Sequence, residues 1–472
     1  MSRQECHGND YRHAATEPAG VLIEGGAQDS AGRAHPLAVG AATPPLTQTA
    51  IAAFAGGGVG TGLFATVPAV LLLYFCTEIL HLPASWATAI VFAPKVWSVL
   101  WDPLVGAWSD RSYTRLGRRR PFLMVGTVGV ALSFIALFSP PNIGHAALGL
   151  WVAVAYFMLA SLYSIYTVPY NAVPAELGET SEIRARLVSW RMFVAMLGVL
   201  LGAGVVPLVI AANGGGRPGY SIMSFWVATI CAVAMAAPIG MLRGRDHGPA
   251  KSLRAARALS WSTLWAAVED KRFVRLALSF LLQLTAVGVV TSATPYLVTK
   301  SFGQAESATG TVMLIMFSVT TLTIPAWSWM GRRAGELRSL KFALIGYAVM
   351  GSCLGIAAIW HAPWPIVMVL FGALGVPFAA MEVLPFTLVA HLIHEGNAGG
   401  RSAEGSFTGV WMSAEKIGLA LGPALNGAVL WLTAAPAGDS LAVHMTIAPA
   451  ALTLTALLFL RQSRGRQDPL LP

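Results

Sequence analysis

Seven charged side chains lie inside long apolar stretches of the 472-residue chain. A charge at the centre of a bilayer costs several kcal/mol, so each of these groups needs a partner or a function. A lone carboxylate in an apolar setting has a raised pKa and can bind and release a proton. Acids and bases in such places can therefore pair, carry a cation or hold a polar solute. The seven residues are Lys95, Asp102, Arg191, Arg275, Glu382, Glu415 and Lys416.

The elements that hold these charges follow from composition. Hydrophobic residues make up 55% of the chain and charged residues only 11%, whereas soluble proteins carry about 25% charged residues. This excludes a water-soluble enzyme, a disordered protein and a collagen-like one. Three of the four cysteines sit inside apolar runs, so no disulfide is expected.

The apolar residues form runs of roughly 20, each long enough to cross a hydrocarbon core about 30 Å thick as a helix. We therefore expect an all-α membrane protein with twelve transmembrane helices in two six-helix bundles. The glycine-rich run from Gly56 to Gly62 lies in the first helix, where close helix packing or a hinge is favoured over a nucleotide loop. The predicted spans are 51–76, 86–108, 121–139, 146–173, 187–211, 221–242, 272–298, 308–330, 340–360, 364–390, 405–432 and 440–460.

The polar segments divide the chain further. Residues 1–48 are predicted to be a disordered tail without a cleavable signal peptide. Residues 49–242 and 272–460 are the two predicted bundles, joined by a basic connector over 243–271 of the kind that lies on an anionic membrane surface. Residues 461–472 form a short basic tail.

Basic residues predict the orientation. Alternate loops together with the C-terminal tail carry 22 Lys and Arg residues, and the loops of the opposite side carry two. Because Lys and Arg are enriched in cytoplasmic loops, both termini are expected in the cytoplasm of a multi-pass plasma-membrane protein. The same split explains the net charge of +9 without nucleic acid as a partner.

One long segment resembles a known family. Val96 to Gly126 reads VWSVLWDPLVGAWSDRSYTRLGRRRPFLMVG, and the segments 168–177, 184–192 and 414–424 agree at the expected places. This resembles the glycoside–pentoside–hexuronide:cation symporters, the melibiose-permease-like branch of the major facilitator superfamily. The resemblance implies the major facilitator fold and cation-driven uptake of small solutes, typically sugars, while some relatives carry lysolipids.

The resemblance implies a cation site on the second span. Lys95, Ser98 and Asp102 are spaced i, i+3, i+7 and share one helix face. The family has two acids on this face, but here only Asp102 remains and Ser98 replaces the other. A Na⁺ site would then rest on Asp102 and the neutral oxygens of Ser98 and Thr167. A lone carboxylate in an apolar setting can instead bind and release a proton, so we favour H⁺ over Na⁺. Lys416 matches the family's lysine near this site, and its ammonium can compete with the cation. The alternative is a static pair between Asp102 and a basic residue such as Lys416.

The resemblance also implies a substrate site. Arg191 matches the family's arginine near the substrate, and Glu382 is expected to face the pocket. Where sugar-carrying relatives have two sugar-binding acids, this chain has Gly62 and Thr167, and where they have a stacking aromatic it has Asn171. The usual disaccharide is therefore not expected as the substrate. Glu382 instead forms a salt bridge in the alternative interpretation. Tyr166 and Tyr170 share one helix face and are expected either to line the cavity or to pack helices.

An inner gate is expected in the loop that follows the second span, where acidic and basic groups would form state-dependent ion pairs across the two halves. Its residues are Asp110, Arg111, Arg118 and Arg119.

The expected function is cation-coupled symport, H⁺ being favoured over Na⁺, of a small polar solute such as a sugar or glycoside. The alternatives are an exporter or lysolipid carrier on the same scaffold and a non-transporting membrane receptor. No enzyme motif, catalytic residue, metal site or cofactor is expected beyond the coupling ion, H⁺ or Na⁺. The expected partners are the solute, the cation and the bilayer, and we expect a monomer.

The orientation is testable by substituted-cysteine labelling in intact cells. We expect an impermeant thiol reagent to label cysteines placed at Gly144 and Gly303 from outside, and a cysteine at Gly117 only from inside, since Gly117 lies in the most basic short loop. External labelling at Gly117 would reverse the assignment.

Overall fold

The computed structural model describes residues 47–112, 114–177, 180–243, 270–398, 404–433 and 437–461, which all belong to one compact unit beginning at Leu46. This part is helical and contains no strand, as predicted for an all-α protein. The elements are α1 (Gln48–Tyr74), η1 (Phe75–Ile79), α2 (Ala84–Arg111), α3 (Arg120–Phe138), α4 (His145–Leu177), α5 (Ser181–Leu200), η2 (Leu201–Val205), α6 (Val206–Ala212), α7 (Gly216–Met241), α10 (Lys271–Tyr296), η3 (Leu297–Ser301), α11 (Ser307–Ala334), α12 (Glu336–Ile359), α13 (Trp364–Ala398), α14 (Glu404–Leu432) and α15 (Ala437–Arg461).

Local sequence explains several of the helix starts. The Thr47 hydroxyl accepts a hydrogen bond from the Ala50 amide at α1, and the Thr180 hydroxyl accepts one from Ile183 at α5. At α10, the Asp270 carboxylate accepts from the amides of Arg272 and Phe273. Such caps satisfy backbone donors that the first helical turn leaves free.

Eleven spans in the described part are long and apolar enough to cross a membrane. The remaining long helix, α14, has 29 residues and carries Glu415 and Lys416 within its apolar sequence. Every predicted span falls on a helix, and the fifth is built from α5, η2 and α6 in succession. The proposed bundle boundaries stay a prediction. The N-terminal tail, nearly all of the connector and nearly all of the C-terminal tail lie outside the described residues.

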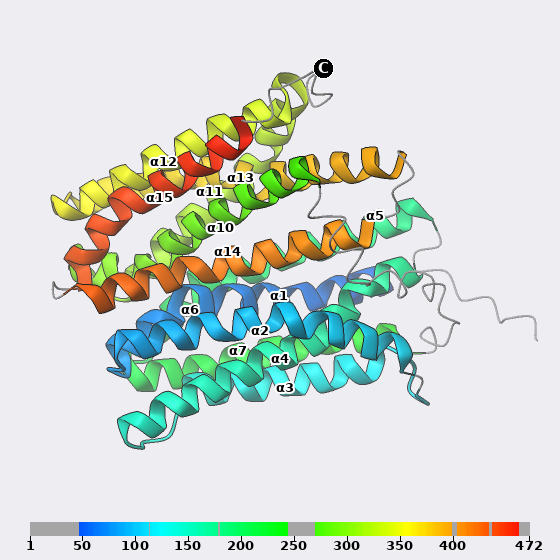
Figure 1. Cartoon of the computed structure of the whole chain (residues 1–472). Helices are drawn as coiled ribbons and strands as arrows, with labels where there is room; N and C mark the ends of the chain where they lie inside the picture. Colours follow the sequence, from blue (N-terminus) through cyan, green and yellow to red (C-terminus); the bar gives the residue numbers. More distant parts are fainter. Residues whose placement is uncertain are drawn as a thin grey trace, which may run out of the picture. The chain divides into compact units, whose positions relative to one another are not determined.

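The helices pack in a pattern that places the charged residues. We call α1 to α7 the first half and α10 to α15 the second half. In the first half, α1 packs on α5 and α7, while α4 packs on α2 and α3 (Figure 1). In the second half, α10 packs on α14 and α15, and α13 packs on α11 and α12. The two halves meet along α2 with α14, α1 with α10, and α11 with α6. The contact of α2 with α14 brings together the helices that carry Asp102 and Lys416.

Glycines allow α1 and α5 to approach closely. A methyl group on Gly58 would lie 2.7 Å from the Arg191 carbonyl oxygen, and one on Gly62 would overlap the carbonyl oxygen of Ala195. On the facing helix, a methyl group on Gly198 would overlap the backbone of Val59. The preference for close packing over a nucleotide loop is thus confirmed, and this packing fixes the position of Arg191 relative to α1.

We expect Gly62→Ala to destabilise the fold by roughly 1–3 kcal/mol, since the backbone of α5 must move to admit the methyl group. Thermal unfolding of the detergent-solubilised protein measures this loss. The matched control is Gly240→Ala in α7, where a methyl group meets nothing within 4 Å and the gain in helix propensity is expected to be neutral or stabilising. Equal unfolding temperatures for the two variants would contradict the close approach.

Candidate functional site

An ion pair joins the two halves at the centre of the site. The Lys416 ammonium on α14 contacts Asp102 Oδ2 on α2, and each side chain is 24% exposed. The other oxygen, Asp102 Oδ1, is buried and has no hydrogen-bond partner in the described part of the chain. The static pair between Asp102 and Lys416, one of the two expected arrangements, is therefore present, and one carboxylate oxygen is left without a hydrogen-bond partner among the described residues.

Ser98 lies on α2, as Asp102 does, and Thr167 lies on α4, which packs on α2. The Ser98 hydroxyl donates to the Lys95 carbonyl at 2.8 Å, and the Thr167 hydroxyl donates to the Tyr163 carbonyl at 2.9 Å. Both side chains are buried. Within the described residues neither hydroxyl bonds to Asp102, so their part in a cation site stays a prediction.

Lys95 has an aromatic neighbour that sequence reasoning missed. Its ammonium lies 5.2 Å from the centroid of the Phe64 ring on α1, and that ring stacks on Tyr163 of α4 with centroids 3.5 Å apart. The negative face of a ring stabilises a desolvated cation by an amount that reaches about 2 kcal/mol. The sequence carried no signal for this contact, because Phe64 and Lys95 lie on different helices.

Arg191 contacts two of the other predicted substrate residues, Asn171 and Tyr170. Its Nη1 donates to Asn171 Oδ1 at 2.7 Å, and its guanidinium carbon lies 5.9 Å from the centroid of the Tyr170 ring. Its Nε is buried and has no hydrogen-bond partner among the described residues. Arg191 and Asn171 therefore form one polar group beside Tyr170, as the resemblance implied for residues of a common pocket.

Tyr166 and Tyr170 are fully buried, and backbone carbonyls occupy their hydroxyls. Tyr170 donates to the Phe54 carbonyl of α1 at 2.7 Å, and Tyr166 donates to the Met235 carbonyl of α7 at 3.2 Å. Helix packing, one of the two expected roles, accounts for these contacts. A role in substrate binding stays a prediction, which the cation–π contact with Arg191 supports for Tyr170 alone.

Glu382 and Glu415 are half-buried and form no ion pair within the described part of the chain. Glu415 on α14 lies within electrostatic reach of Arg191 and Lys95, and Glu382 on α13 lies within reach of Glu415. The alternative interpretation of Glu382 as a salt-bridged residue therefore finds no partner here. Glu415 was noticed in the sequence as an intramembrane acid, but nothing in the sequence placed it beside Arg191.

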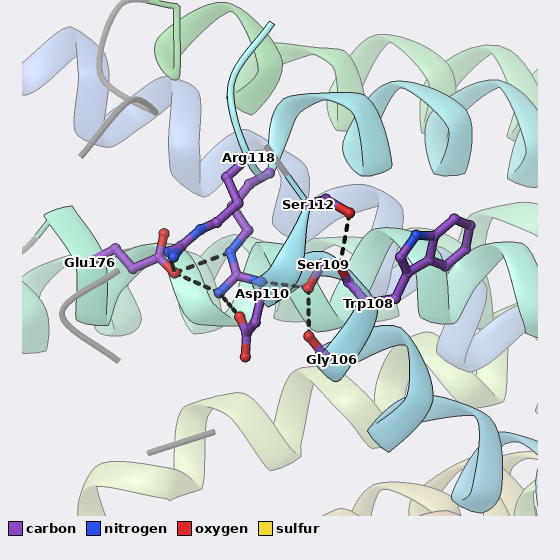
Figure 2. A network of polar contacts seen from close by, with 8 residues as sticks. Gly106, Trp108, Ser109, Asp110, Ser112, Arg118 and Glu176 are labelled. Atoms are coloured by element: carbon purple, nitrogen blue, oxygen red, sulfur yellow. Dashed lines mark hydrogen bonds and ion pairs between the residues drawn. The ribbon is translucent and has the colours of Figure 1, made fainter. Parts of the chain in front are cut away.

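A dense network lies at the end of the fold where α2 ends and α3 begins, which we call the basic end (Figure 2). Glu176 of α4 pairs with both Arg118 and Arg119, and its Oε1 lies 2.5 Å from Arg119 Nη2. Arg119 also pairs with Asp110 at 2.6 Å and donates to the Ser109 hydroxyl at 2.5 Å. Burial alone would lower the pKa of Arg119, but the hydrogen bonds and charges of Glu176 and Asp110 outweigh it and raise the pKa.

These gate residues pair within one half. Asp110 lies on α2, Arg119 lies in the loop before α3, and Glu176 lies on α4. All three elements belong to the first half. The sequence predicted state-dependent ion pairs across the two halves. The ion pairs of this network in the structure instead join residues of the first half to one another. Arg111 is exposed at the last residue of α2 and takes no part in the network.

The opposite end, which we call the π-helical end, joins the two halves directly. Lys300 of η3 pairs with Glu78 of η1 at 2.6 Å. The hydroxyls of Thr77 and Tyr296 are 2.5 Å apart, and Tyr74 donates to the Thr299 hydroxyl at 3.3 Å. These contacts hold the halves together at this end.

The central pair can be tested by a double-mutant cycle. We expect Asp102→Ala and Lys416→Ala each to cost roughly 1–3 kcal/mol, less than the 3–5 kcal/mol typical of a broken buried pair because both side chains are partly exposed. The double variant should lose less than the sum of the two single losses, since it leaves no unpaired charge. Thermal unfolding measures all three, and strictly additive losses would show that the pair contributes nothing.

Comparison with known proteins agrees with the geometry. Residues 53–462 match the family described as MFS/sugar transport protein. The sodium-dependent lysophosphatidylcholine symporter 1 of Xenopus tropicalis is 23% identical over 72% of this chain and 70% of its own length. The putative glycoside/cation symporter YagG of Escherichia coli K12 is 25% identical over 76% of this chain and 77% of its own.

Solved structures show the same fold. The crystal structure of the nucleoside transporter NupG has a TM-score of 0.64, with 16% identity over 89% of this chain and 100% of that one. The expected fold, a multi-pass bundle of the major facilitator type, is thereby confirmed, and the neighbours are transporters, not enzymes. With the family match spanning the helical unit nearly end to end, the chain belongs to the MFS/sugar transport family.

Proposed function

We propose that this protein is a secondary active transporter that couples the entry of a cation, H⁺ in preference to Na⁺, to uptake of a small polar solute. Membership in the family and the resemblance to glycoside/cation symporter YagG support this proposal. The basic loops support an orientation with the basic end in the cytoplasm. In that orientation the contacts at the π-helical end close the outer side.

The observation that carries the proposal is the ion pair between α2 and α14. A proton that binds Asp102 removes its charge and releases Lys416, so the link between the halves weakens. A Na⁺ ion would act in the same way by displacing the ammonium. Because each partner belongs to a different half, the occupancy of one carboxylate changes how the halves hold each other, and this supplies a physical route from cation binding to alternating access.

The return step must exchange the contacts at the two ends. Opening the π-helical end requires Lys300 and Glu78 to separate. Closing the basic end would let Asp110, Arg118 and Arg119 exchange the bonds they make within the first half for partners in the second half, and would give exposed Arg111 a partner there.

The substrate site of this proposal is centred on Arg191 and Asn171, with Glu382 on the opposite half. A sugar or glycoside would accept hydrogen bonds from the guanidinium and donate to the carboxylate. A lysolipid is the second candidate, and the relative from Xenopus tropicalis favours it.

Replacing Asp102 by Asn tests the coupling. We expect Asp102→Asn to abolish uphill accumulation in proteoliposomes while downhill exchange persists at least in part, since an amide cannot cycle a proton. Asp439→Asn, an exposed acid-to-amide change in the first turn of α15, is the control. Concentrative uptake by Asp102→Asn at the wild-type level would refute the role. Uptake driven by a Na⁺ gradient at fixed pH would assign coupling to Na⁺.

A further inference from the structure

A cleft lies in the second half between α10, α12, α13 and α15, and it holds about 420 Å³ of empty space, counted with its open mouth. Because successive spans cross in alternate directions, the starts of α10 and α12 and the ends of α13 and α15 lie at the basic end. The lining of the cleft includes Arg272, Arg275 and Leu276 of α10, Leu388 and Leu392 of α13, and Leu460 of α15.

The lining changes from charged to apolar between the surface and the interior. Arg272 is exposed and Arg275 is half-buried, whereas Leu276 on the same helix is buried. The leucines contributed by α13 and α15 are buried as well. Cations at the mouth and leucines inside match an amphiphile whose anionic group stays at the surface while its hydrocarbon part enters the cleft.

The charge of the cleft is positive, since its described lining holds two arginines and no acid. The nearest acid along α10 is Asp270, whose carboxylate accepts hydrogen bonds from the backbone amides of Arg272 and Phe273 at 2.8 and 3.3 Å. Arg275 Nε donates to the Lys271 carbonyl at 3.1 Å, which ties this guanidinium to the first turn of α10. A guanidinium has five N–H donors and can bind a phosphate group through two of them at once.

The apolar interior favours a lipid over a free anion. A small soluble anion would interact with the arginines but would bury none of the leucine surface. An acyl chain adds affinity with each CH₂ group that it buries. In the proposed orientation the basic end faces the inner leaflet, where basic pockets between transmembrane helices bind the headgroups of anionic lipids.

We propose that this cleft binds one anionic phospholipid of the inner leaflet, at a site separate from that of the transported solute. The lipid phosphate lies against Arg272 and Arg275, and part of an acyl chain lies against Leu276 and Leu388. The bound lipid joins the ends of α10, α12, α13 and α15. The choice of leaflet rests on the proposed orientation, whereas the site itself depends on neither the coupling ion nor the solute.

Native mass spectrometry of the full chain in detergent, titrated with dioleoylphosphatidylglycerol, tests the proposal. We expect the first phosphatidylglycerol to bind at least about tenfold more tightly than dioleoylphosphatidylcholine, which has the same chains but no net charge. Glycerol 3-phosphate, the headgroup without chains, is expected not to bind at the same concentrations. Equal affinity for the two lipids would overturn the proposal, and glycerol 3-phosphate that binds as tightly as the lipid would replace it by a free-anion site.

The double variant Arg272→Gln/Arg275→Gln removes both charges from the mouth and keeps the apolar interior. We expect its affinity for phosphatidylglycerol to fall at least about tenfold and its affinity for phosphatidylcholine to stay at the wild-type level. The control is Arg332→Gln, an exposed arginine in the last turn of α11 that is not among the described lining residues. Wild-type affinity in the double variant would refute the site, and an equal loss in Arg332→Gln would show a diffuse basic surface in its place.

A second variant tests the interior of the cleft. Leu388→Trp adds volume to the lining without changing the charge, so we expect it to weaken binding of phosphatidylglycerol by at least about tenfold as well. Size-exclusion chromatography shows whether this variant is folded, and the arginine variants test the site independently of it. Unchanged affinity in folded Leu388→Trp would place the acyl chain outside the cleft and contradict the proposal.

Discussion

Charged groups in a membrane-spanning bundle must be compensated, and in this protein one compensation connects the two halves. Asp102 on α2 and Lys416 on α14 satisfy each other across the line where these helices pack. Removing one partner would leave an isolated, partly buried charge, which costs roughly 1–3 kcal/mol. The ion pair therefore links the two halves at the contact of α2 with α14.

The two ends of the bundle use polar contacts differently. At the π-helical end, Lys300 and Glu78 join the halves, together with hydrogen bonds between Thr77 and Tyr296 and from Tyr74 to Thr299. At the basic end, the ion pairs of Glu176 with Arg118 and Arg119 lie within the first half. The two ends of this structure therefore differ, with polar bonds across the halves at one end and within a half at the other.

The remaining charges give the site its polarity. Arg191 and Lys95 are supported by neutral groups, and Glu382 and Glu415 stand on the other half without a cationic partner in the described chain. The relatives include both a lysolipid symporter and a glycoside/cation symporter. The fold is common to both chemistries, so the side chains of the site must distinguish them.

Hydropathy and the positions of charged residues were enough to determine the helical spans and the class of membrane protein. This works because a bilayer requires each backbone group to be bonded within its own helix, so every span is a local feature. The motif from Val96 to Gly126 was enough to indicate the family. Partner choice was not local. The pairing of Lys416 with Asp102 was only one of two alternatives that the resemblance left open, and the support of Lys95 by Phe64 was not expected at all. Both depend on which helices meet and at what register. Only the tertiary structure decides that, since these contacts join residues tens to hundreds of positions apart.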